Sequence, residues 1–125
     1  MKITKQIRKQ VHDKYFGGCA YCGQYVPLKD MQVDHMTPKC HISEKKNNFE
    51  QIHSIDNLMP SCRSCNHYKR AYDLEQFRHA MITLHKRISQ IYICKVAERY
   101  GIITIKPFDG RFYFEIPEHV RCLPF

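Results

Sequence analysis

The 125-residue sequence lacks three features that would assign it to a membrane, secreted or low-complexity class. It contains no apolar run of the roughly 18 residues that a membrane-spanning helix needs, so we expect a soluble protein with no membrane partner. The N-terminal stretch from Met1 to Arg8 is too charged for the apolar region of a signal peptide, which favours a cytoplasmic, reducing location. No segment is low in complexity, and the sequence contains no internal repeat beyond two Cys-x-x-Cys pairs.

Acidic residues are scarce relative to basic ones. The sequence has 12 Asp and Glu against 20 Lys and Arg, which gives a formal net charge of +8 and a pI near 9.2. This excess suits a polyanionic partner such as DNA, although charge alone does not exclude a merely solvated basic surface. A chain this short buries only a thin core, so we expect a further element to stabilise the fold.

Cysteine is the residue type that supplies this element. The four cysteines of the two pairs are Cys19, Cys22, Cys62 and Cys65. Because each pair has the same two-residue gap, four thiolates can satisfy the tetrahedral coordination of Zn²⁺ and leave no open position, which predicts a structural zinc site. The other three cysteines lack such partners, although Cys40 with His41 remains an alternative source of ligands.

The hydrophobic pattern and turn residues predict an α+β fold with residues 1–72 as a zinc-bearing core and 73–125 as an extension packed on it. In the core we expect a helix capped by Thr4 and stopped by Gly17, and a short hairpin that joins 25–26 to 31–33. We also expect a second strand at 58–60 and a helix over 62–71.

The extension is expected to contain one long helix and one β-hairpin. The helix opens at Asp73 and ends at Gly101. Its apolar seam is Leu74, Phe77, Met81, Leu84, Ile88 and Ile91. Packing within the chain explains this seam most simply, and a homodimer through residues 74–91 is the alternative. The hairpin pairs 102–105 with 112–116 around Asp109-Gly110, a strong two-residue turn signal.

The residues that could perform chemistry lie between and beside the cysteine pairs. His35 is a natural general base, since an unperturbed imidazole has a pKa of about 6.5. The carboxylate of Asp34 and the amide oxygen of Asn66 are hard ligands suited to Mg²⁺ or another divalent ion. Successive strand residues point to opposite faces, so Asp34 and His35 act on one substrate only if the strand ends or bulges there. On the helix predicted over 62–71, Asn66 shares one face with Lys69 and Arg70, which we expect to contact phosphate groups. The candidate DNA-binding residues are Lys39, Lys69 and Arg70.

Together these motifs resemble the HNH endonucleases, the His-Me finger nucleases with a ββα-metal core, in their zinc-stapled form. The motifs in order are Cys19-Ala-Tyr-Cys22-Gly23, Val33-Asp34-His35, Pro38, Asp56-Asn57-Leu58 and Cys62-Arg-Ser-Cys65-Asn66. The resemblance covers roughly residues 5–71. It implies hydrolysis of DNA phosphodiester bonds to 5′-phosphate and 3′-hydroxyl ends, with Asn57 as a support residue that ties the loop near His35. Many family members place His at the position of Asn66, and the adjacent His67 replaces it only if the helix register shifts.

Three hypotheses follow from these residues. The first is a metal-dependent DNA endonuclease with a structural zinc and a separate catalytic ion. The second is a non-catalytic zinc-ribbon module that binds nucleic acid through its basic surface, with salt-sensitive affinity and no cleavage. The third is a protein-interaction adaptor that self-associates through the 74–91 seam. The Asp34-His35 pair favours the first, because a binding module does not need a base beside a carboxylate.

Overall fold

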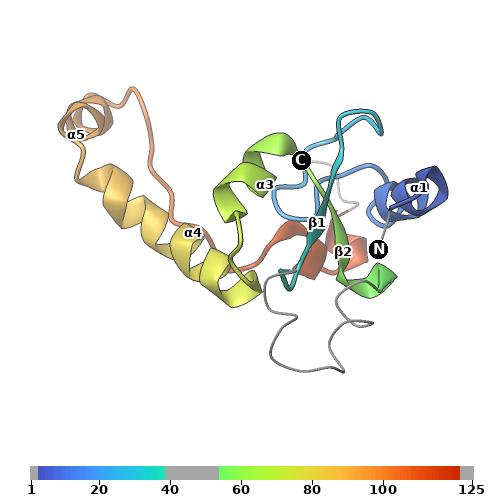
Figure 1. Ribbon diagram of the computed structural model, residues 1–125. Helices are drawn as coiled ribbons and strands as arrows, with labels where there is room; N and C mark the ends of the chain where they lie inside the picture. The colour runs from blue at the N-terminus through green and yellow to red at the C-terminus, as the bar shows by residue number, and fades with distance from the viewer. Residues whose placement is uncertain (1–2, 39–53, 122–125) are drawn as a thin grey trace. The chain divides into compact units, whose positions relative to one another are not determined.

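The computed structural model describes residues 3–38 and 54–121 of the chain, and it divides into two compact units (Figure 1). The core unit comprises residues 1–74 and 112–125, and the helical unit comprises residues 75–111. The predicted mixture of helix and strand is confirmed. The elements of the core unit are α1 (Lys5–Asp13), β1 (Gln32–His35), η2 (Ile55–Asn57), β2 (Leu58–Ser61), α3 (Arg63–Lys69), η3 (Tyr113–Glu115) and α6 (Glu118–Arg121).

Helix α1 begins at the predicted cap. The Oγ1 atom of Thr4 accepts a hydrogen bond from the backbone N–H of Ile7 at 3.2 Å, which satisfies one of the free N–H groups of the first turn. Val11 lies on the apolar face and is fully buried. The helix ends at Asp13, and Gly17 then adopts φ +86°, a left-handed conformation that favours glycine.

Among the described residues, the central sheet consists of the antiparallel pair of β1 and β2. Asp34 pairs with Met59, and His35 pairs with Leu58. Helix α3 packs on β1, whereas α1 packs on β2 (Figure 1). All four residues of β2 are buried, which makes this strand the centre of a small core.

The predicted hairpin between 25–26 and 31–33 is wrong. Tyr25 forms only an isolated bridge with Gly18, and β1 pairs with the distant β2 instead. The N–H groups of Asp30 and Met31 both donate to the carbonyl of Pro27, so the intervening residues close into a local turn. The chain therefore reverses here without strand pairing.

The predicted C-terminal hairpin is also wrong. No strand forms over residues 102–116, and Tyr113–Glu115 form the 3-10 helix η3. Two interactions compete with the hairpin. The carboxylate of Asp109 accepts a hydrogen bond from the backbone N–H of Arg111 at 2.9 Å, which closes a local Asx turn. The N–H of Tyr113 donates to the carbonyl of Tyr21, within the cysteine loop, rather than to a partner strand.

The predicted long helix is divided in two: α4 (Leu74–Ser89) and α5 (Tyr92–Arg99). At the break, the Ser89 hydroxyl donates to the His85 carbonyl at 2.7 Å, a contact that bends helices. Ile91 is extended and precedes α5, so it lies outside the α4 seam. Gly101 has φ +75° just beyond the end of α5.

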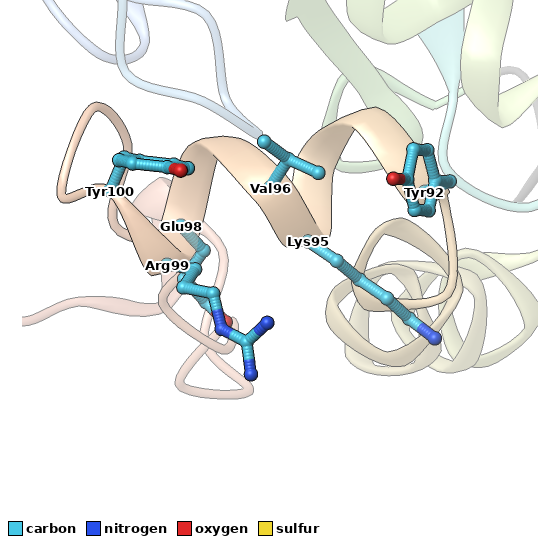
Figure 2. Close-up of a pocket in the computed structure, with 6 residues that line it drawn as sticks. All are labelled: Tyr92, Lys95, Val96, Glu98, Arg99 and Tyr100. Carbon is cyan, nitrogen blue, oxygen red and sulfur yellow. The ribbon is translucent and has the colours of Figure 1, made fainter.

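Helix α5 presents both aromatic and cationic side chains to solvent (Figure 2). Tyr92 is 80% exposed and Tyr100 is 77% exposed. Lys95 and Arg99 extend from the other side of the helix (Figure 2). None of the helices within residues 3–38 and 54–121 combines the length and hydropathy that a bilayer crossing requires.

Candidate active site and metal centre

The four paired cysteines meet at one point of the core unit. Cys19 and Cys22 lie in the loop after α1, whereas Cys62 caps α3 and Cys65 lies in its first turn. Their Sγ atoms all lie within 4.8 Å of one another, and those of Cys22 and Cys62 are 3.8 Å apart. Zn–S bonds of about 2.3 Å in a regular tetrahedron place the sulfur atoms about 3.8 Å apart. The cluster therefore fits a zinc ion.

Backbone hydrogen bonds fix this cluster to the sheet. The N–H of Ala20 donates to the carbonyl of Pro60 in β2 at 2.8 Å, and the N–H of Gly23 donates to the carbonyl of Cys19 at 2.9 Å. Gly23 has φ +80°, and a Cβ atom there would lie 2.6 Å from the Cδ1 atom of Tyr113. Only glycine therefore allows both the tight loop and the close approach of this ring.

The thiols of the cluster influence one another's ionisation. A hydrogen bond from Cys65 lowers the pKa of Cys19 to about 4, and the same interaction raises the pKa of Cys65. Burial is the main cause that raises the pKa of Cys22 to about 11. Thiolates this close repel one another, so a bound cation is needed for all four to ionise together.

The Asp34-His35 pair forms the last two residues of β1, and both residues pair with β2, Asp34 with Met59 and His35 with Leu58. Asp34 is 7% exposed and His35 is 8% exposed. Burial raises the pKa of the Asp34 carboxyl above its usual value, and a hydrogen bond from Tyr21 and the charge of Lys69 oppose this rise. A carboxylate buried in this way is stabilised by hydrogen bonds and charges of the protein, because little water reaches it.

Lys69 is the main partner of this pair. Its ammonium lies 3.1 Å from Oδ2 and 3.4 Å from Oδ1 of Asp34, and it donates to the His35 carbonyl at 3.1 Å. The side chain is fully buried. In place of the exposed phosphate-contacting position expected from the sequence, Lys69 occupies an internal position that fixes both residues of the pair.

Asn66 approaches the same face of β1 from one turn earlier in α3. Its Nδ2 donates to the Oε1 of Gln32 at 2.5 Å. Gln32 and Asp34 are two residues apart and share one face of the strand, whereas Asn66 and Lys69 are three apart and share one face of the helix. The interface of β1 and α3 thus contains a carboxylate and an amide, whose oxygen atoms are ligands suited to a hard divalent ion.

Asn57 ties down the turn that follows His35. Its Oδ1 accepts from the Thr37 N–H at 2.8 Å, and its Nδ2 donates to the Thr37 carbonyl at 3.1 Å. The backbone carbonyl of Asn57 also accepts from the Met36 N–H at 2.9 Å. Asn57 is buried at the end of η2, immediately before β2, so these bonds connect the turn to the sheet.

The remaining candidates are placed differently. Arg70 is exposed at the C-terminal end of α3, and His67 is exposed on the same helix. Lys39, Cys40 and His41 lie outside the described residues.

Sequence reasoning missed Tyr21 and Gln32. Both carried a signal: Tyr21 lies between two paired cysteines, and Gln32 lies two places before Asp34 on a predicted strand.

One comparison with known proteins gives a match to part of the chain. Residues 19–71 match the family model described as HNH endonuclease, whereas residues 1–18 and 72–125 lie outside the match. Neither the curated proteins nor the solved structures contain a significant match to the chain. The matched segment contains the four clustered cysteines, the Asp34-His35 pair, Asn57 and Asn66. Residues 19–71 are therefore similar to the HNH endonuclease family, and the four clustered cysteines are consistent with its zinc-binding type.

Proposed function

We propose that the protein is a metal-dependent DNA endonuclease that hydrolyses phosphodiester bonds. The observation that supports this proposal is the buried Asp34-His35 pair at the end of β1. Lys69 contacts the side-chain carboxylate of Asp34 and the backbone carbonyl of His35. Burying a carboxylate and an imidazole at consecutive positions costs solvation free energy, and such sites are commonly functional. The HNH match over the same residues supports this reaction class.

Each polar residue has a distinct role in the proposed reaction. His35 accepts a proton from the water that attacks phosphorus. The Asp34 carboxylate and the Asn66 amide oxygen would hold a divalent ion, Mg²⁺ or a similar cation, which would neutralise the charge that develops on the phosphate. Asn57 supports the turn after His35 through its two bonds to Thr37. The products carry 5′-phosphate and 3′-hydroxyl ends.

The zinc ion and the basic surface have supporting functions. A zinc ion held by the cysteine cluster would connect the loop after α1 to the start of α3 and would contribute its binding energy to folding. Free thiols suited to zinc fit a reducing, cytoplasmic location. The net charge of +8 attracts DNA, and the exposed Arg70, together with Lys39, would contact its phosphates.

Plasmid cleavage tests the reaction. Purified zinc-loaded protein is incubated with supercoiled DNA in EDTA, Mg²⁺, Mn²⁺ or Ni²⁺, beside His35→Ala and the matched control His67→Ala. We expect nicked or linear DNA only with added divalent metal, and at least about a 100-fold loss of rate in His35→Ala, because general-base catalysis contributes about 10²–10⁴-fold. His67 is exposed, so His67→Ala is expected to retain most of the rate.

The binding-module hypothesis predicts the opposite result. If the zinc-loaded protein binds DNA with a steep salt dependence yet cleaves neither DNA nor RNA with any of these metals, catalysis is rejected.

Self-association through α4 is a separate proposal. The exposed Ile91 lies outside that helix, which shortens the seam to residues 74–88. Sedimentation equilibrium tests it, because Ile88→Glu should abolish any dimer that the seam forms.

A further inference from the structure

Tyr21 connects the cysteine cluster to the proposed ligand of the catalytic ion. It lies between Cys19 and Cys22, and its hydroxyl donates to Oδ2 of Asp34 at 2.5 Å. Its side chain is almost fully buried, with 4% exposure. A hydrogen bond to an ionised acceptor is roughly twice as strong as one between neutral groups, so this contact can determine where the carboxylate points.

Residues outside the family match hold Tyr21 in place. The N–H of Tyr113 donates to the carbonyl of Tyr21 at 3.1 Å, and the N–H of Phe114 donates to the carbonyl of Ala20 at 2.8 Å. The Tyr21 ring meets the ring of Phe112 edge-on at 5.4 Å and 83°, and that of Phe114 at 6.2 Å and 89°. The returning segment 112–115 thus restrains both the backbone and the ring of Tyr21.

The two oxygen atoms of Asp34 are engaged unequally. Oδ2 receives the Tyr21 hydroxyl and the closer approach of Lys69, at 3.1 Å, whereas Oδ1 lies 3.4 Å from the Lys69 ammonium. Tyr21 and Lys69 approach from different elements, the cysteine loop and α3, so together they restrict rotation of the carboxylate. The Lys69 ammonium contacts both oxygens, and Oδ1, which has the longer contact, would be the oxygen that accepts the divalent ion.

We infer that Tyr21 is a positioning residue for the catalytic divalent ion, and that segment 112–115 belongs to the scaffold of the active site. The inference rests on the proposed function, which assigns Asp34 as a ligand. Tyr21 does not touch the ion; it acts through Asp34. Partners that orient a metal ligand in this way commonly alter metal affinity or activity by about 10–100-fold when removed.

Tyr21→Phe tests this inference, because it retains the ring that packs on Phe112 and Phe114 and removes only the hydroxyl. Binding of Mn²⁺ alone to zinc-loaded protein is measured by electron paramagnetic resonance. We expect affinity to fall by about 10–100-fold while zinc content is unchanged. Cleavage by the variant should recover at high Mn²⁺, since the defect lies in metal affinity. Tyr92→Phe is the matched control, because that hydroxyl is on a side chain 80% exposed.

Two further variants separate the possible failures. Asp34→Ala should abolish Mn²⁺ binding at this site; if it does not, the ligand assignment in the proposed function fails. If Asp34→Ala abolishes binding and Tyr21→Phe binds Mn²⁺ within twofold of wild type, the positioning role alone is overturned. Phe112→Leu replaces the test if Tyr21→Phe does not fold: weaker Mn²⁺ binding at full zinc content supports the inference, and unchanged binding overturns it.

Discussion

Replacing Lys69 by methionine should destabilise the core unit by about 3–5 kcal/mol, because it leaves the buried Asp34 carboxylate without its cation. Hydrogen bonds to charged groups contribute about 1.5–3 kcal/mol each. The ammonium contacts the Asp34 carboxylate at 3.1 Å and the His35 carbonyl at 3.1 Å, so adding the two contributions gives about 3–6 kcal/mol, a range that includes the cost of breaking a buried ion pair.

Urea unfolding of zinc-loaded protein, followed by circular dichroism, measures this loss. Lys9→Met is the matched control, because it removes the same charge and side chain from an exposed position of α1. The double variant Asp34→Leu/Lys69→Met should recover much of the stability, since an apolar pair of similar volume can replace a buried ion pair. A loss in Lys69→Met below about 1 kcal/mol, similar to that of Lys9→Met, would refute the reasoning.

Three other changes test separate parts of the structure. Cys62→Ser should lower the zinc content, measured by atomic absorption, and reduce the melting temperature of the core. Full zinc retention would contradict the assignment of Cys62 as a zinc ligand. Gly23→Ala should lower the melting temperature more than Gly110→Ala, because both have positive φ but only the new Cβ at 23 meets a ring, that of Tyr113. Asn57→Ala should slow plasmid cleavage at unchanged zinc content, because the turn at Thr37 loses two hydrogen bonds; an unchanged rate contradicts this support role.

The parts of the site that rest on local spacing were predictable from the sequence. Equal two-residue gaps place the thiols of each pair on one side of a turn or first helical turn, so the cluster of Cys19, Cys22, Cys62 and Cys65 follows from the pattern. The cap of α1 at Thr4 follows for the same reason, since the bond joins residues three apart.

The burial of Lys69 could not be predicted from local spacing in the sequence. Periodicity correctly places Asn66 and Lys69 on one face of α3, but it does not state what that face meets. Because the face packs on β1, Lys69 is buried beside Asp34. Tertiary packing decides whether a lysine on a helix contacts solvent, DNA or an internal carboxylate.

The C-terminal hairpin failed as a prediction for a related physical reason. Asp109-Gly110 is a strong turn signal, and Gly110 does adopt φ +93°. The backbone N–H groups of Tyr113 and Phe114, however, bond to carbonyls of the cysteine loop, about 90 residues earlier in the sequence. Local turn chemistry contains no information about a partner so distant in the chain, so the competing contacts could not be foreseen.

The most direct test of the central claim is the single-turnover rate of supercoiled plasmid cleavage at saturating Mg²⁺ for wild type and His35→Ala, both with verified zinc content and fold. The proposed function predicts cleavage by the wild type and a rate at least about 100-fold lower for the variant. Equal cleavage rates would contradict His35 as the base, and the absence of cleavage by zinc-loaded wild type with every divalent metal would contradict the endonuclease itself.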